Sequence, residues 1–203
     1  MVKYCDNILH ALKITFANED AAISKSVGID ARRVAEVYCA DTKLNISPRY
    51  FSPGFAFGGS CLPKDLQAIL RFASLKSLRL EMLQGLLKSN EIQIQDLVRR
   101  VLKYQPSTVG IVGLAFKPDT DDMRESPYVK VAKALIGEGI ELKIFDPVVQ
   151  PEKLIGSNKQ QVQKALRHLE ELLVGSVKEL STADLIIVNH PVIDADCVRD
   201  WLK

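Results

Sequence analysis

The stretch TVGIVGL, residues 108–114, decides the fold of the second half of this chain. It is a short run rich in β-branched residues and bounded by glycines, which is typical of a buried strand in a parallel sheet. The elements expected after it are a helix over 127–136, a strand over 141–145, a polar helix near 158–174, a strand over 185–188 and a short helix near 194–202. Alternating strands and helices predict a parallel α/β domain over residues 106–203.

Residues 1–105 are expected to form an all-helical domain. A helix over 2–27 ends at Gly28, and Asp30 caps a second helix that runs to about Ala40. Residues 42–60 hold prolines and aromatic residues without periodicity, which predicts a structured loop that carries function. A third helix is expected to start near Pro63, and a long amphipathic helix to cover 80–104.

The composition excludes several classes of protein. The chain has 203 residues, 47% of them hydrophobic and 26% charged, which is ordinary for a globular protein. Its net charge is +2, and no basic run is interleaved with aromatic residues, so nucleic acid is not an expected partner. No stretch approaches the ~20 apolar residues that span a bilayer, so a cytoplasmic protein is expected. Four scattered cysteines and three isolated histidines indicate neither a disulfide framework nor a metal site.

Cys61, in the run GFAFGGSCLPKD at residues 54–65, is the candidate nucleophile. Gly58 and Gly59 allow a sharp turn and the close approach of a substrate. Pro63 suits the first turn of a helix, so Cys61 is expected at a helix N-terminus, where the helix end and Lys64 favour the thiolate. The alternative is a buried structural cysteine, which would need neither paired glycines nor a charged helix start.

The run GLAFKPDTDDMRESP, residues 113–127, lies between a predicted strand and the next helix. It is therefore expected at the carboxyl edge of the sheet, where open α/β sheets bind ligands. Lys117 and Arg124 are candidates to hold phosphates or a nicotinamide nucleotide, and nearby acids to fix the loop or orient Arg124: Asp121, Asp122 and Glu125. The alternative is a merely solvated loop. No GxGxxG follows a strand, so the chain shows no ordinary dinucleotide site.

Lys3 and Asn7 lie four residues apart in the first expected helix, so both side chains are expected on one face. There they could meet a single ligand group. The residues alone favour another interpretation, a solvated helix end, since Lys13, Asn18 and Glu19 further along are equally polar.

The two long runs, in this order, resemble the UDP-glucose/GDP-mannose dehydrogenase family, and the wording PGFAFGGSC is closest to its GDP-mannose 6-dehydrogenase branch. The opening VKYCDNILHALKITFANE, residues 2–19, resembles the start of the family's central helix. The resemblance implies an α/β protein, with a helical dimerisation domain over 1–105 and a Rossmann-like nucleotide-sugar-binding domain over 106–203. It covers only the central and C-terminal parts of the family, so the N-terminal NAD domain is expected to be missing.

Members of this family oxidise the C6 alcohol of a nucleotide sugar to a carboxylate, using NAD and a cysteine thioester. By resemblance, Cys61 would attack the intermediate aldehyde, and Lys3 and Asn7 would stabilise the developing oxyanion. Asp65 would help to activate water or relay a proton in thioester hydrolysis.

The resemblance also implies which residues bind substrate and cofactor. The sugar nucleotide would be held by Asn45, Tyr50, Phe55, Gly58 and Lys117. Arg124 would reach the NAD side. GDP-mannose enzymes often carry an arginine before the Pro-Gly of this loop, whereas here Ser52 precedes Pro53, so GDP-mannose and UDP-glucose both stay open as substrates.

The sequence and the resemblance leave two functions open. The first is the central and C-terminal portion of an NAD-dependent nucleotide-sugar 6-dehydrogenase, expected to be inactive as an isolated chain. The alternative is an inactive truncated or split module for nucleotide-sugar binding and dimerisation. In both, the first long helix is expected to form a homodimer, because it is apolar on more than one side.

Overall fold

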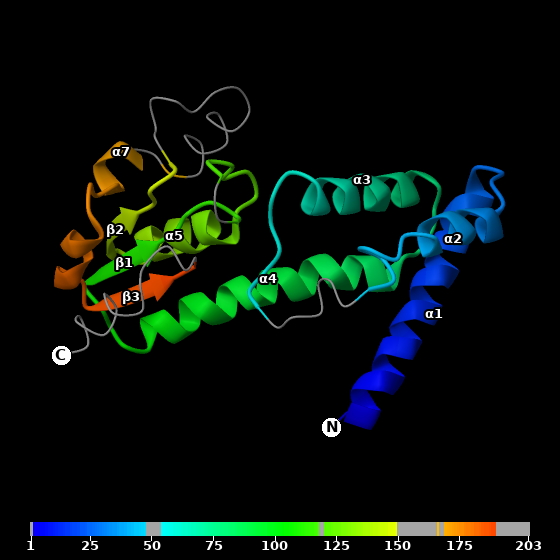
Figure 1. The fold of residues 1–203 in the computed structure, drawn as a ribbon, viewed down its shortest axis with the longest axis horizontal. Coiled ribbons are helices and arrows are strands. Elements are labelled where there is room, and N and C mark those ends of the chain that lie inside the picture. Colours follow the sequence, from blue (N-terminus) through cyan, green and yellow to red (C-terminus); the bar gives the residue numbers. More distant parts are fainter. Residues whose placement is uncertain (1, 48–53, 118–119, 150–165, 167–168, 190–203) are drawn as a thin grey trace. The chain divides into compact units, whose positions relative to one another are not determined.

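The computed structural model describes residues 2–47, 54–117, 120–149, 166 and 169–189 (Figure 1). The chain divides into two compact units, Met1–Phe55 with Lys64–Ser89, and Ala56–Pro63 with Asn90–Lys203. We call them the helical unit and the sheet unit. The short segment that carries Cys61 belongs to the sheet unit. This division falls inside the fourth helix, and the domain boundary expected at residues 105/106 stays a prediction.

The four helices expected in the first half are confirmed. They are α1 (Val2–Ser26), α2 (Ala31–Cys39), α3 (Leu62–Leu75) and α4 (Glu81–Leu102). The chain leaves α1 through Gly28, whose φ of 73° is left-handed. The Asp30 side chain accepts a hydrogen bond from the Arg32 backbone N–H at 2.9 Å, so it caps α2 as expected.

A small apolar core holds the helical unit together. Its buried residues are Ala73, Leu80 and Leu83, against which Ile23 of α1 and Leu70 of α3 pack. Glu19 of α1 adds a polar link, because its carboxylate accepts hydrogen bonds from the backbone N–H groups of Met82 (2.7 Å) and Leu83 (3.1 Å). Both N–H groups lie in the first turn of α4, where backbone N–H groups have no carbonyl partner within the helix. Glu19 thus caps α4 from a helix far away in the sequence.

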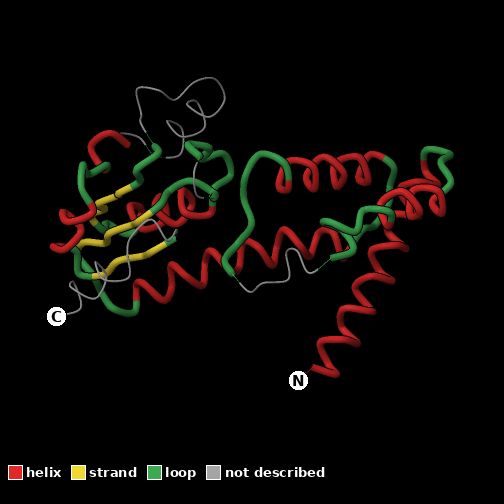
Figure 2. The backbone as a smooth tube through the Cα atoms, viewed as in Figure 1, coloured by secondary structure: helices red, strands yellow, loops and turns green. Residues whose placement is uncertain are grey.

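The sheet unit contains the predicted parallel α/β arrangement. In the described part of the chain, β1 (Thr108–Val112), β2 (Glu141–Phe145) and β3 (Leu185–Val188) form a parallel sheet in the order β2-β1-β3 (Figure 2). The central strand, β1, is buried along most of its length. It ends two residues earlier than expected because Gly113 adopts a φ of 83°.

Short helices complete the sheet unit. They are α5 (Pro127–Gly137), α7 (Leu169–Leu172) and the 3-10 helix η2 (Val177–Thr182). Of the polar helix expected near 158–174, only the α7 part is described in full, and the helix expected near 194–202 lies outside the described residues. No helix in the described ranges is long and apolar enough to cross a membrane.

Candidate active site

A loop at the carboxyl edge of the sheet is fixed by residues that follow the neighbouring strands. We call residues 113–127 the sheet-edge loop. Asp146, directly after β2, accepts hydrogen bonds from the N–H groups of Leu114 (2.8 Å) and Ala115 (3.2 Å). Asn189, directly after β3, donates through Nδ2 to the carbonyl oxygens of Gly113 (3.2 Å) and Ala115 (3.0 Å). The start of the loop is therefore held from both sides of β1.

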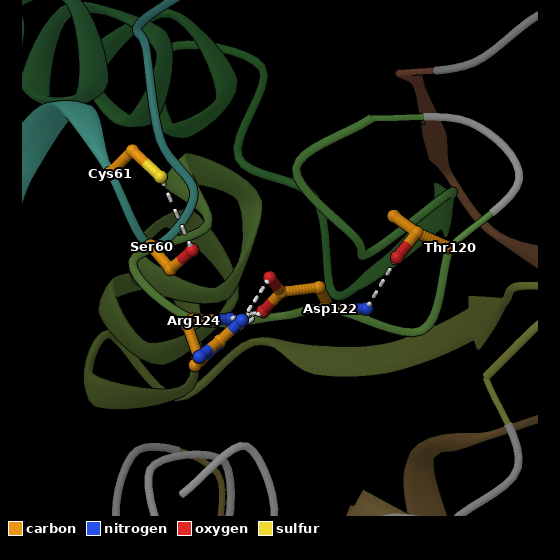
Figure 3. A network of polar contacts seen from close by, with 5 residues as sticks. All are labelled: Ser60, Cys61, Thr120, Asp122 and Arg124. Carbon is orange, nitrogen blue, oxygen red and sulfur yellow. Dashed lines mark hydrogen bonds and ion pairs between the residues drawn. The ribbon is translucent and has the colours of Figure 1, made fainter.

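The described part of the loop is an ordered network rather than a solvated segment. Ser126 is fully buried and donates its hydroxyl to the Leu114 carbonyl oxygen at 2.7 Å, which joins the two ends of the loop. Met123 of the same loop is also buried. In between, Thr120 Oγ1 accepts from the Asp122 backbone N–H at 3.1 Å (Figure 3). This bears out the ordered network that the dense charges of the loop predict.

Asp122 orients Arg124. Its two carboxylate oxygens accept from Arg124 Nε and Nη2, both at 2.8 Å, and Oδ1 also accepts from the Arg124 backbone N–H at 3.0 Å. The side-chain hydrogen bond to Arg124 lowers the pKa of the Asp122 carboxyl below its usual 3.8. The same bond raises the pKa of Arg124. Glu125 pairs instead with Lys130, at 3.1 Å.

Cys61 lies at the start of a helix, as the sequence predicts. It immediately precedes α3, and its thiol is free and exposed. The Ser60 hydroxyl lies 3.8 Å from the Cys61 sulfur, within hydrogen-bonding distance for sulfur (Figure 3). Because the thiol is exposed, the alternative of a buried structural cysteine is wrong.

The paired glycines let the segment before Cys61 pack directly on the sheet-edge loop. A Cβ added at Gly58 would lie 2.5 Å from the Glu125 carbonyl oxygen and 2.6 Å from Pro127 Cδ. A Cβ at Gly59, where φ is 86°, would lie 2.9 Å from the Phe116 ring. No side chain fits at either position, so both glycines are needed for close approach.

Four of the predicted site residues occur together in the sheet unit: Gly58, Cys61, Lys117 and Arg124. Lys117 is exposed, and its Nζ lies 5.4 Å from the centre of the Phe116 ring, over which the ammonium is attracted to the aromatic face. The ammonium of Lys117, the guanidinium of Arg124 and the thiol of Cys61 thus belong to one unit.

The remaining described candidates belong to the helical unit: Lys3, Asn7, Asn45, Phe55 and Asp65. Lys3 and Asn7 are exposed and lie one turn apart on α1, as expected. Asp65 forms an exposed ion pair with Lys64 at 3.5 Å. Tyr50 lies outside the described residues.

Asn45 has a structural contact of its own. Its Nδ2 donates to the Tyr38 carbonyl oxygen at 3.1 Å, which ties the loop after α2 to the end of that helix. It also lines a pocket of about 520 Å³ in the helical unit, together with Lys13, Phe16, Ala17, Tyr38, Cys39 and Ile46. Asn45 therefore lies beside a cavity large enough for a small molecule.

Three residues that hold the sheet-edge loop were not predicted from the sequence: Ser126, Asp146 and Asn189. A usable signal was present, because Asp146 and Asn189 are each the first polar residue after a strand. Among the described residues, no group of three or more His, Cys, Asp and Glu side chains is placed to hold a metal ion.

Comparison with known proteins identifies the class of protein that this fold and site define. Residues 1–92 match the central domain of the UDP-glucose/GDP-mannose dehydrogenase family, and residues 110–197 match its UDP binding domain. The chain belongs to this family.

Individual members of the family differ in how similar they are to this chain. GDP-mannose 6-dehydrogenase of Pseudomonas aeruginosa is 44% identical over 191 residues, which are 94% of this chain and 44% of the relative. UDP-glucose 6-dehydrogenase TuaD of Bacillus subtilis is 35% identical over 156 residues, 75% of this chain and 33% of the relative. The chain thus spans less than half the length of these relatives.

The fold also matches solved structures of dehydrogenases. A 1.55 Å crystal structure of a ternary complex of GDP-mannose dehydrogenase from Pseudomonas aeruginosa superposes with a TM-score of 0.86 and 44% identity, over 93% of this chain and 44% of that one. A UDP-glucose dehydrogenase from the archaeon Pyrobaculum islandicum gives a TM-score of 0.60 at 33% identity, over 93% and 42% of the two chains.

Proposed function

We propose that this chain provides the cysteine nucleophile and the nucleotide-sugar-binding loop of an NAD-dependent 6-dehydrogenase that oxidises the C6 alcohol of GDP-mannose to a carboxylate. The observation that carries the proposal is the direct packing of the Cys61 segment on the sheet-edge loop. The 44% identity to GDP-mannose 6-dehydrogenase supports GDP-mannose over UDP-glucose, whose dehydrogenase TuaD is 35% identical.

Cys61 would carry the covalent step. Its exposed sulfur adds to the carbonyl carbon of the C6 aldehyde, a carbon–sulfur bond forms, and the carbonyl oxygen becomes an oxyanion. Oxidation of this thiohemiacetal gives a thioester, and water then releases the carboxylate and restores the thiol. Lys3 and Asn7 are assigned to stabilise the oxyanion, and Asp65 to activate the water.

NAD, when bound, supplies the hydride acceptor for both oxidations. The residues present fit a contact with NAD at Arg124, because Asp122 engages Nε and Nη2 and leaves Nη1 to donate to a phosphate or amide oxygen. The strand β1 is not followed by a GxGxxG turn, so we assign no further NAD contacts to this chain.

We assign Lys117 as the positively charged residue that contacts the nucleotide sugar. It is exposed and lies on the sheet-edge loop, at the edge where α/β sheets bind ligands. With Asn45, Tyr50, Phe55 and Gly58 it completes the proposed substrate contacts. Its ammonium suits an anionic or hydroxyl-rich ligand, as a nucleoside diphosphate sugar is.

The test is calorimetric titration of the chain with GDP-mannose, with UDP-glucose as the comparison. We expect GDP-mannose to bind more tightly. Lys117→Ala should weaken GDP-mannose binding roughly tenfold or more, because a charge-assisted hydrogen bond contributes about 1.5–3 kcal/mol. The matched control is Lys178→Ala, since Lys178 is an exposed lysine of η2, before β3 rather than after a strand. No binding of GDP-mannose at millimolar concentration would overturn the proposal.

A further inference from the structure

Cys61 and Arg124 share one support. We call residues 58–61 the cysteine segment. Its glycines contact the sheet-edge loop at two places, Gly58 at Glu125 and Pro127, and Gly59 at the Phe116 ring. Phe116 and Glu125 enclose the stretch of the loop that holds Arg124. The cysteine segment therefore packs on the same loop that carries Arg124.

Arg124 has little freedom to leave this place. Its side chain makes two hydrogen bonds of 2.8 Å to Asp122, and its backbone N–H makes a third, of 3.0 Å, to the same carboxylate. Asp122 is held in turn through its backbone, by Thr120 Oγ1 on its N–H and by the Phe116 N–H on its carbonyl oxygen at 3.3 Å. A planar guanidinium held by a bidentate carboxylate keeps one orientation.

Arg124 lies within electrostatic range of Cys61. The pKa of Arg124 is raised mainly by its hydrogen bond to Asp122, and to a smaller extent by charge on the Cys61 sulfur. Figure 3 shows Ser60, Cys61, Asp122 and Arg124 in the same close view. Two further charged groups neighbour Cys61 in the sequence, Lys64 and Asp65, and these form an exposed pair with each other.

We propose that Arg124 is the fixed positive charge that serves the Cys61 sulfur, and that Asp122 is a positioning residue that keeps the guanidinium there. This role rests on the proposed function, in which the attacking thiolate and the thiohemiacetal oxygen are both anionic. A cation that is already in place favours both species without rearrangement during the reaction. Arg124 thereby acts on the sulfur as well as toward NAD.

The experiment compares two alkylating reagents of different charge on the whole chain. Iodoacetate is anionic and iodoacetamide is neutral, and both attack the thiolate, so the ratio of their rate constants reports the local electrostatic potential rather than the thiolate fraction. Rates at Cys61 are measured by peptide mapping at low ionic strength. Cys39, exposed on α2, is the internal reference.

Arg124→Met should lower the iodoacetate-to-iodoacetamide ratio at Cys61 about two- to threefold, the order of effect expected when one nearby unit charge is removed in water, and leave the ratio at Cys39 unchanged. Arg124→Lys should restore part of the ratio. Asp122→Glu keeps the net charge but displaces the carboxylate by one methylene, so it should lower the ratio toward that of Arg124→Met.

Lys64→Met is the matched control, since it removes another positive charge close to Cys61 in the sequence, and it should change the ratio less than Arg124→Met. An unchanged ratio in Arg124→Met overturns the proposal, as does an equal slowing of both reagents, which would show a purely structural role. In the unmodified chain, 1 M salt should also lower the ratio at Cys61, and a salt-independent ratio overturns the proposal without any variant.

These outcomes are independent of the proposed function, because neither reagent is a nucleotide sugar. A chain that fails to bind GDP-mannose could still show the charge effect at Cys61. A chain that binds GDP-mannose and shows no charge effect would retain the function and lose this role of Arg124.

Discussion

Asp122 makes the stability of the protein depend on pH at the acid end. Its carboxyl has a lowered pKa because it accepts hydrogen bonds from Arg124 in the folded state only. A group with a depressed folded pKa stabilises the fold above its unfolded pKa, and this contribution is lost as the pH falls through the folded value. The stabilisation by Asp122 is therefore lost in a pH range that begins near 3.8 and extends below it.

We expect the difference in unfolding free energy between the unmodified chain and Asp122→Asn to be constant from pH 7 to about pH 5, and to shrink as the pH is lowered from 4 toward 2. Urea unfolding followed by circular dichroism measures it. The matched control is Asp96→Asn, in which the exposed, surface ion pair of α4 with Arg99 is lost. A difference that is the same at pH 2.5 and pH 6 would contradict this account.

Individual site residues were predictable where their partners are close in the sequence. Cys61 at the start of α3 follows from Pro63, two residues away, and the orientation of Arg124 by an acid follows from Asp122, two residues away. The role of Asp146 was not predictable in the same way. Its carboxylate accepts hydrogen bonds from the N–H groups of Leu114 and Ala115, more than thirty residues earlier in the sequence, and only folding brings these groups together.

At the scale of elements, the cysteine segment depends on two glycines that have no room for a side chain. Gly58→Ala should destabilise the chain by about 2–3 kcal/mol, because its Cβ would meet the backbone oxygen of Glu125 at 2.5 Å and something must shift. Gly85→Ala is the matched control, since Gly85 lies in α4 with nothing within 4 Å of its Cβ position. It should stabilise α4 by about 0.5–1 kcal/mol.

Thermal unfolding of the two variants measures both effects. Gly58→Ala should also change the alkylation rate of Cys61, because the cysteine segment can no longer pack closely on the sheet-edge loop. Gly85→Ala should leave that rate unchanged. Equal stabilities for the two variants would mean that the close approach at Gly58 is not needed by the fold.

The elements themselves were mostly predictable, because their signals are local. The strands β2 and β3 have the bounds expected from the sequence, and α5 starts at the expected proline. The cap of α4 was not predictable. Glu19 looks like any polar residue of an exposed helix, and only tertiary packing brings it to the Met82 and Leu83 N–H groups more than sixty residues away.

At the scale of the whole molecule, we propose a homodimer formed through α1, as expected from the sequence. The helix leaves several large apolar side chains exposed, among them Leu12 (44%), Ile14 (64%) and Phe16 (43%). These side chains lie on more than one side of α1, and packing against a second copy would remove part of this apolar surface from water.

Light scattering after size exclusion should give twice the mass of one chain for the unmodified protein. Ile14→Glu should shift it to the mass of one chain, because a charge would be buried in the interface. Ile92→Glu, at an exposed apolar position of α4 (40%), is the matched control and should stay dimeric. A monomeric unmodified chain, or dissociation by both variants alike, would count against α1 as the interface.

The division into units was only partly predictable. The switch from helices to alternating strands near Pro106 is visible in the sequence. That residues 56–63 join the sheet unit is not visible in the sequence, because the reason is the contact of Gly58 and Gly59 with loop residues more than fifty-five positions further on.

This placement of residues 56–63 has a consequence for how such chains recombine. A crossover between two parent genes anywhere from residue 64 to residue 112 takes the cysteine segment from one parent and the sheet-edge loop from the other. A parent with a bulkier residue at either glycine position would then supply a cysteine segment that clashes with a loop carrying Glu125, Pro127 and Phe116. The nucleophile and its supporting loop are therefore encoded in two separate stretches of the gene, which should be exchanged together wherever the parents differ at these contact residues.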